Sequence, residues 1–165
     1  KNKELYEQMK LIRTHGVANV NAASSFTRMG CNFRYTDLQA SLGLVQLAKV
    51  HERIDNLNVI YKMYQDAFQG MEWIKLIPVY IENGEIPLYV EVMVEEREKL
   101  IAYLESHNVQ SRPIYPDLDS ATYLESFDIF PNAQLFGTNG LILPCGPDQP
   151  LENIDQVISL LKIFR

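Results

Sequence analysis

The stretch GCNFRYTDLQASLGLVQL, residues 30–47, decides the architecture because it joins a polar segment to a strongly apolar helical pattern. Thr36 and Gln39 have the spacing of a capping box, in which two side chains satisfy free backbone N–H groups of a first turn. Apolar residues then recur mostly three or four positions apart, at Leu38, Leu42, Val45, Ile54, Leu57, Tyr61, Tyr64 and Phe68. The spacing predicts one long helix over residues 36–70, about 50 Å long at 1.5 Å per residue.

Such a helix is too long to be covered by residues 71–165 alone, so we expect it to link two domains or to pack on a second subunit. Gly43 within it costs about 1 kcal/mol relative to alanine, which indicates close approach by another backbone. Tyr61 and Tyr64 are expected to be core residues rather than a stacking surface for a cofactor.

The residues before this helix predict a shorter helix and a polar connection. Leu5, Met9 and Ile12 have helical spacing, and Gly16 after His15 can take the left-handed conformation that ends a helix. No start signal precedes this pattern, which is typical of a sequence cut from a longer one. Residues 17–35 form a polar connection of a length that is usually functional or mobile.

After Gly70 the pattern changes to a small α+β layer. Alternation predicts strands over 73–81 and 88–94 with a turn at 83–84, and shorter strands over 109–114 and 141–144. Helices are expected over 95–107, with Asn108 as a left-handed cap, over 131–136, and from Pro150 onward, and residues 117–127 are expected to form a loop with a helical turn. The expected class is α/β, with an α+β C-terminal portion of short, mainly antiparallel strands and helices on one face.

Composition limits the function classes. With 165 residues, 47% of them hydrophobic, and a net charge of −6, the chain is globular, and its acidity argues against a general nucleic-acid binder. No apolar run reaches the ~18–20 residues needed to span a bilayer. Cys31 and Cys145 are too few for a disulfide framework or a zinc site, so a reduced, cytoplasmic protein is expected.

Two clusters could bind an anion. Asn32 and Arg34 lie just before a helix N-terminus, where free N–H groups suit a phosphate, although they could equally satisfy loop carbonyls. Arg112 and Tyr115 lie in a segment stiffened by two prolines, and an ion-paired arginine at a strand end is the alternative there. The three histidines are expected to have structural roles, and no phosphate-binding glycine loop, HExxH pair or nucleophile elbow is present.

Residues 30–47 resemble the DegT/DnrJ/EryC1/StrS family of pyridoxal-phosphate-dependent aminotransferases, which act on nucleotide-linked keto-sugars. The family pattern is a glycine, an aromatic residue, Asn-x-Arg, a Thr/Ser-Asp/Glu start and an Ala-rich helix containing Gln-Leu. Further matching stretches follow the family in order, at residues 11–16, 97–100, 111–118 and 141–144. Cys31 replaces the usual aromatic residue, and Asp119 stands where many relatives have histidine, which puts a substrate contact at that position in doubt.

The resemblance implies a pyridoxal 5'-phosphate cofactor whose Schiff-base lysine lies upstream of this chain, so no catalytic residue is assigned here. By position, Asn32 would reach the cofactor phosphate of the neighbouring subunit, and Arg34 would support it. Phe33, Arg112 and Tyr115 would approach the substrate. The implied organisation is the end of a large domain (1–35), a linking helix (36–70) and a small C-terminal domain (71–165).

The expected function is therefore that of the C-terminal portion of an aminotransferase, inactive alone. It would move an amino group from a donor such as glutamate to a nucleotide-linked keto-sugar, in a homodimer with shared active sites and without nucleic acid or membrane as partner. Two alternatives stay open: a sugar dehydratase of the same family, and a stand-alone module that binds a sugar nucleotide or a partner. The first would have histidine in place of the upstream lysine, and the second would be a stable monomer.

Overall fold

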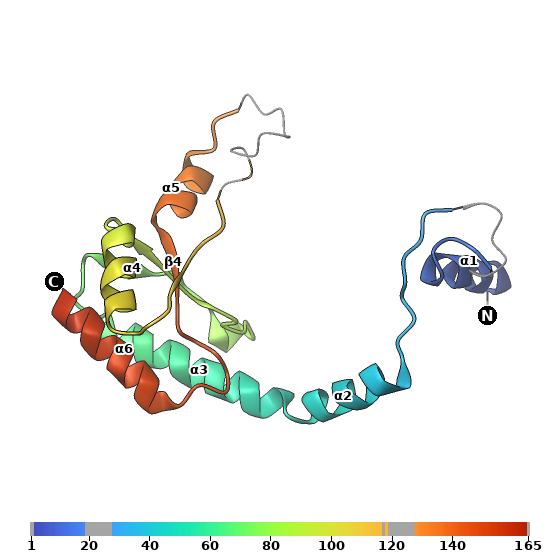
Figure 1. Ribbon diagram of the computed structural model, residues 1–165, viewed down its shortest axis with the longest axis horizontal. Coiled ribbons are helices and arrows are strands. Elements are labelled where there is room, and N and C mark those ends of the chain that lie inside the picture. The colour runs from blue at the N-terminus through green and yellow to red at the C-terminus, as the bar shows by residue number, and fades with distance from the viewer. Residues whose placement is uncertain (1, 19–27, 117, 119–127, 165) are drawn as a thin grey trace. The chain divides into compact units, whose positions relative to one another are not determined.

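A computed structural model describes residues 2–18, 28–116, 118 and 128–164 (Figure 1). The chain divides into two compact units, Lys1–Lys49 and Val50–Arg165.

Two backbone segments of the first unit pack against each other. Helix α1 (Lys3–Arg13) begins at Asn2, whose side chain accepts a hydrogen bond from the backbone N–H of Leu5. The end of α1 and the residues just after it pair with residues 31–33 through three backbone hydrogen bonds, from Cys31 N to Ile12 O (2.9 Å), from Phe33 N to Arg13 O (3.0 Å) and from His15 N to Cys31 O (3.0 Å). These bonds hold the segment that precedes the second helix.

Glycine is required at two positions of this packing. Gly16 has a φ of +78°, as expected for a left-handed helix end, and a Cβ there would lie 1.7 Å from the carbonyl oxygen of Arg28. A Cβ on Gly30 would lie 2.3 Å from the backbone nitrogen of Gly16. The two glycines let the chain approach itself more closely than any side chain permits.

The long helix expected over residues 36–70 is interrupted. Helix α2 (Asp37–Ala48) begins with the predicted capping box at Thr36 and Gln39, ends at Lys49, and is followed directly by helix α3 (Val50–Ala67). The prediction of one continuous helix was wrong because α2 contains no buried residue, so no packing contact holds the junction in helical geometry. The neighbour of Gly43 is also not a backbone: a Cβ there would lie 3.2 Å from the Tyr35 hydroxyl.

The second unit is built around an antiparallel sheet. Its four strands are β1 (Ile74–Leu76), β2 (Val90–Val94), β3 (Arg112–Pro113) and β4 (Gly140–Leu143), in the order β1-β2-β4-β3. Val92 is opposite Leu76 on one side and Leu141 on the other. The class and the antiparallel pairing expected from the sequence are confirmed.

Three strands are shorter than predicted. β2 begins at Val90 instead of residue 88, and the limits of β1 and β3 follow from single backbone N–H groups. Pairing of β1 ends after Ile77, since Pro78 has no N–H, and the N–H of Val79 donates to the Tyr61 hydroxyl instead (2.9 Å). Residues Ile81–Asn83 then form a 3-10 turn, η2, closed by Gly84 in the left-handed conformation. At β3 the predicted start is wrong because the N–H of Val109 donates to Leu104 O (2.9 Å) and closes the preceding helix.

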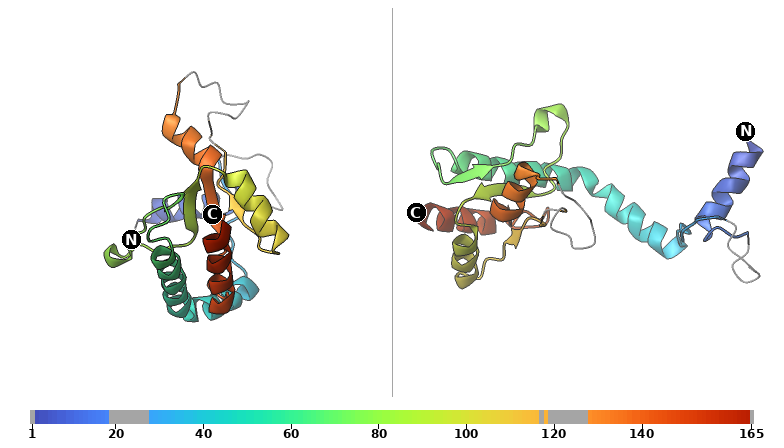
Figure 2. Two further views of the ribbon diagram at one scale, coloured as in Figure 1. Left: turned by 90° about the vertical axis from the view of Figure 1, so that its left-hand side faces the viewer. Right: turned by 90° about the horizontal axis from the view of Figure 1, so that it is seen from above.

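Helices α3, α4 (Arg97–Ser106) and α6 (Leu151–Phe164) supply the core with the sheet, and α3 and α6 run side by side below it in Figure 1 and Figure 2. Tyr61 and Tyr64 are 1% and 0% exposed, which confirms the prediction that they are core residues. Tyr61 donates to Ile77 O (3.1 Å) and Tyr64 to Pro144 O (2.9 Å), so both buried hydroxyls are satisfied. Burial raises the pKa of Tyr64 above its ordinary value.

Helix α5 (Pro131–Asn139) begins at the predicted proline and runs three residues further than expected before β4. It contacts β2 and β4. Asn108 has the predicted left-handed conformation, with a φ of +60°. Most of the predicted loop over 117–127, Asp119 included, lies outside the described residues.

Candidate functional site

The side chain of Asn32 is oriented by Arg34. Asn32 Oδ1 accepts hydrogen bonds from the backbone N–H of Arg34 (3.3 Å) and from its Nε (3.0 Å), and an isolated bridge to Thr14 fixes the backbone of Asn32. Because Oδ1 receives both donors, the amide nitrogen Nδ2 is the atom left to donate elsewhere, and it makes no hydrogen bond to any residue that the structure describes. The exposed Asn32 amide can therefore donate to an external acceptor.

The guanidinium of Arg34 also faces His15, whose Nε2 lies 3.5 Å from Nη2. His15 has a φ of +56°, a left-handed conformation that is uncommon for a residue other than glycine. The sequence alone indicates His15 only as part of a helix end. Its place beside Arg34 arises from the pairing of residues 12–15 with 31–33, which no local spacing indicates.

Phe33 lies on the opposite side of this segment, against α1. Its side chain is 64% exposed and lines a mainly apolar cavity of about 490 Å³. The other lining residues come from α1, namely Tyr6, Met9, Lys10, Ile12 and Arg13. This cavity could bind a flat or apolar group. Its described lining residues include no histidine, cysteine or carboxylate that could act as a general base or nucleophile.

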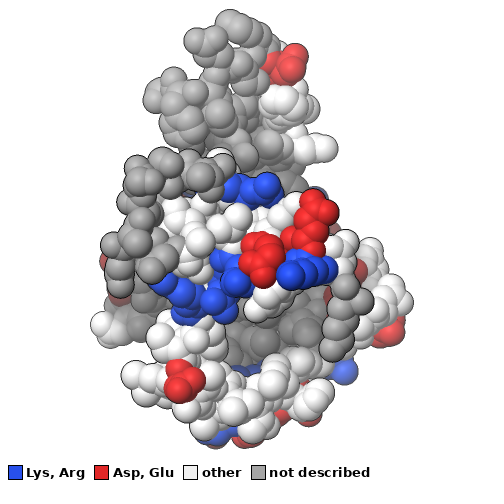
Figure 3. All heavy atoms as spheres, turned by 90° about the vertical axis from the view of Figure 1, so that its right-hand side faces the viewer, with Lys and Arg blue, Asp and Glu red and all other residues white. Residues whose placement is uncertain are grey.

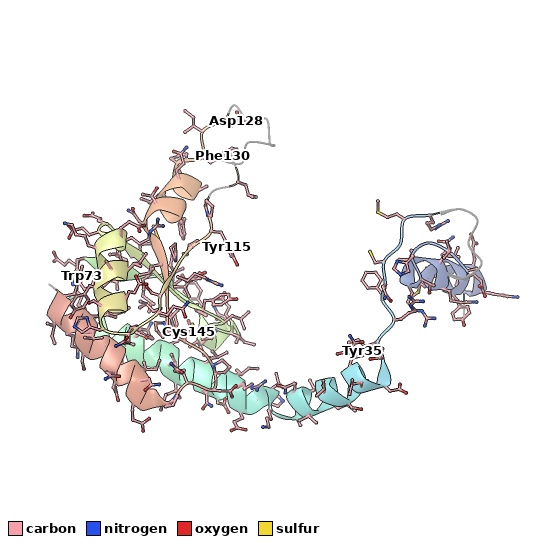
Figure 4. The ribbon with its side chains drawn as sticks, viewed as in Figure 1. Tyr35, Trp73, Tyr115, Asp128, Phe130 and Cys145 are labelled. Atoms are coloured by element: carbon pink, nitrogen blue, oxygen red, sulfur yellow. The ribbon has the colours of Figure 1, made fainter. Side chains whose placement is uncertain are left out.

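In the second unit, Arg112 and Tyr115 lie together, as expected from their shared segment. Figure 4 labels Tyr115 in this segment. The guanidinium carbon of Arg112 is 5.5 Å from the ring centroid of Tyr115 and 5.3 Å from that of Tyr89. Arg112 forms no ion pair with any described residue. The described residues therefore do not support the alternative of an ion-paired arginine at a strand end. Tyr89 was missed because its contact with Arg112 depends on strand pairing.

Asn32, Phe33 and Arg34 belong to the first unit, and Arg112 and Tyr115 belong to the second. Among the described residues, no group of three or more His, Cys, Asp or Glu is placed to hold a metal ion. No described helix combines the length and the apolar character needed to cross a membrane. On the face drawn in Figure 3, side chains of both charge signs lie close together near the middle, among uncharged residues.

Cys145 and His107 have structural contacts. The buried Cys145 thiol accepts a hydrogen bond from the Val90 N–H (3.3 Å), and burial raises its pKa, which favours the unreactive thiol form. His107 ends α4, with Nδ1 2.8 Å from Tyr103 O, as expected for a histidine at a helix C-terminus. Neither residue has the surroundings of a nucleophile or a general base.

Comparison with protein families gives one match that covers nearly the whole chain. The family model described as the DegT/DnrJ/EryC1/StrS aminotransferase family matches residues 1–162. Among curated relatives, GDP-perosamine synthase of Escherichia coli O157:H7 is 26% identical over 170 residues, which cover 99% of this chain and 45% of that protein. UDP-4-amino-4,6-dideoxy-N-acetyl-beta-L-altrosamine transaminase of Campylobacter jejuni (strain 81-176) is 29% identical over 98% of this chain and 46% of that protein.

Solved structures show the same fold. DesV of S. venezuelae, crystallised with a ketimine intermediate, superposes with a TM-score of 0.81 at 21% identity, over 99% of this chain and 44% of that chain. The PLP-form of the sugar aminotransferase Spr1654 from Streptococcus pneumoniae, described as putative, gives 0.77 at 22% identity, over 98% and 43%. The chain thus spans slightly less than half the length of these relatives.

Proposed function

The chain belongs to the DegT/DnrJ/EryC1/StrS aminotransferase family, and from this premise we propose that it is the C-terminal portion of an enzyme that aminates a nucleotide-linked keto-sugar. The observation that carries the proposal is the family match over residues 1–162. The names of the relatives support the substrate class, since they describe a GDP-perosamine synthase and a UDP-linked amino-sugar transaminase. The proposed amino donor is glutamate.

The residues present fit one end of pyridoxal phosphate. Arg34 holds Oδ1 of Asn32, so Nδ2 is the donor that no described residue uses, and a phosphate oxygen accepts hydrogen bonds of this kind. Arg34 would hold Asn32 in place and add positive charge, while Phe33, Arg112 and Tyr115 would bind and orient the substrate. When bound, the cofactor supplies the electron sink for amino transfer. The lysine that anchors it would come from residues upstream of this chain.

The apolar surface of α2 supports a larger assembly. Five of its large apolar side chains are more than half exposed in this chain, namely Leu38, Leu42, Leu44, Val45 and Leu47. A helix that is apolar around its circumference is normally buried. We therefore assign residues 1–35 to the end of a large domain, 36–70 to a linking region and 71–165 to a small domain, within a homodimer that shares its active sites. This surface disfavours the stand-alone module.

The same partial sequence would fit a dehydratase of the family, in which a histidine upstream of this chain would replace the lysine.

Both described cysteines are free thiols, which agrees with a reducing compartment such as the cytoplasm.

The function is tested on the native gene product. We expect an intact mass at least twice 19.0 kDa and, after loading with pyridoxal phosphate, glutamate-dependent conversion of a UDP- or GDP-linked keto-sugar to the amino-sugar, followed by mass spectrometry. Turnover without glutamate and with loss of water would favour the dehydratase. A native mass of 19.0 kDa would contradict the proposal and favour a binding module.

Replacing Asn32 in the full-length protein should weaken cofactor binding without affecting folding. Asn32→Asp keeps the acceptor for Arg34 but exchanges the Nδ2 donor for an anionic oxygen, so it should lower pyridoxal-phosphate affinity more than Asn32→Ala. For Asn32→Ala we expect the affinity for pyridoxal phosphate to fall roughly tenfold or more, because that is the typical contribution of a hydrogen bond to a charged group. Equilibrium dialysis measures the affinity, and the exposed Asn83→Ala is the matched control. Unchanged affinity in both Asn32 variants would remove Asn32 from the cofactor site.

A further inference from the structure

The pairing of the sheet brings Tyr89 to Arg112. Ile142 of β4 is opposite Arg112 on one side and Glu91 on the other, so these three side chains share one face of the sheet. Tyr89 lies immediately before β2, at the end of the strand that carries Glu91. This places its ring 5.3 Å from the guanidinium carbon.

Tyr115 reaches the same group from the segment that continues β3, with its ring centroid 5.5 Å from the guanidinium carbon. Both distances lie within the range at which a cation is attracted by the quadrupole of an aromatic ring. Glu91 shares this face of the sheet but forms no ion pair with Arg112. No other described acidic residue forms an ion pair with the Arg112 guanidinium.

We propose that Tyr89 is a positioning residue which, together with Tyr115, holds the Arg112 guanidinium in place to bind an oxyanion of a ligand. This inference rests on the proposed function only in identifying that oxyanion, which is either the diphosphate of a nucleotide-linked sugar or a carboxylate of the amino donor. In this arrangement Tyr115 orients the substrate through Arg112.

The two rings would act by restricting the side chain. A free arginine side chain populates many rotamers, and ordering them opposes ligand binding. Ring contacts restrict that freedom before the ligand arrives, while the guanidinium keeps N–H donors in the planar fork that matches phosphate or carboxylate. Half of the Tyr89 side chain is exposed, so its ring is not needed to fill the core.

The test uses the native full-length protein and titrates uridine diphosphate, guanosine diphosphate and glutamate by calorimetry. Tyr89→Leu should weaken binding of one probe class by roughly two- to fivefold, the range expected for an exposed cation–ring contact. Tyr89→Phe retains the ring and should bind like the wild type. Tyr80→Leu is the matched control, because Tyr80 is also 50% exposed and makes no cation–ring contact among the described residues. Which probe responds identifies the source of the oxyanion.

A double-mutant cycle separates this inference from the proposed function. In an Arg112→Leu background, Tyr89→Leu should cause no further loss, and an undiminished second loss would overturn the positioning role. If Arg112→Leu weakens binding but Tyr89→Leu and Tyr115→Leu do not, the inference fails and Arg112 stays a ligand contact. If Arg112→Leu leaves all three probes unaffected, the inference also fails, whereas the aminotransferase assay decides the function independently. Tyr115→Leu repeats the test at a side chain that is 73% exposed, should Tyr89→Leu fail to fold.

Discussion

Gly140→Ala is expected to destabilise the second unit by roughly 2–3 kcal/mol, the cost of forcing an extra group into a packed site. A Cβ at Gly140 would lie 2.5 Å from the carbonyl oxygen of Phe136 and 2.6 Å from Cδ1 of Ile114. The carbonyl belongs to helix α5 and cannot rotate away as a side chain would. Gly140 has a φ of −75°, which alanine adopts readily, so the expected loss is steric and not conformational.

The same substitution should also disturb the candidate substrate segment. The carbonyl oxygen of Gly140 accepts a hydrogen bond from the Ile114 N–H (3.0 Å), and Ile114 lies between Arg112 and Tyr115 in the chain. We therefore expect faster hydrogen exchange of the β2 and β4 amides together with a lower urea midpoint.

Gly146→Ala is the matched control, because no atom lies within 4 Å of its Cβ position. It should leave the midpoint unchanged or raise it slightly, since alanine restricts the unfolded chain. Equal destabilisation by the two substitutions would show that packing at Gly140 does not explain the effect.

Leu161→Ala is expected to destabilise the chain by roughly 2–5 kcal/mol, because it removes a buried side chain and leaves a cavity in the core. Leu161 is fully buried on α6, whereas Ile163, two residues later, is 74% exposed. Ile163→Ala in the same 165-residue chain should change the unfolding free energy by about 0.5 kcal/mol or less. Urea unfolding followed by circular dichroism compares the two variants. A larger loss at Ile163 than at Leu161 would mean that α6 presents its other face to the sheet.

Much of the local structure could be predicted from the sequence because its causes are local. Thr36 and Gln39 make their capping box with neighbours three residues away, and Gly16 and Asn108 end helices in left-handed conformations that few residue types accept. The alternation in residues 88–94 predicted the inner strand β2, observed over Val90–Val94, because one of its faces is buried. The stretch over residues 30–47 was sufficient to indicate the family, which the match over residues 1–162 confirms.

Tertiary structure decided where these elements stop and which side chains meet. The break at Lys49 precedes Leu57, the first buried residue of α3. β1 stops where Pro78 interrupts the ladder and the Tyr61 hydroxyl accepts a hydrogen bond from the next N–H. The contact of Arg34 with His15 joins residues 19 positions apart in the chain, and that of Arg112 with Tyr89 depends on the register of three strands. Periodicity reports which face of an element is apolar, but it contains no information about which distant segment will pair with it. That pairing follows from burial and hydrogen bonding across the whole fold.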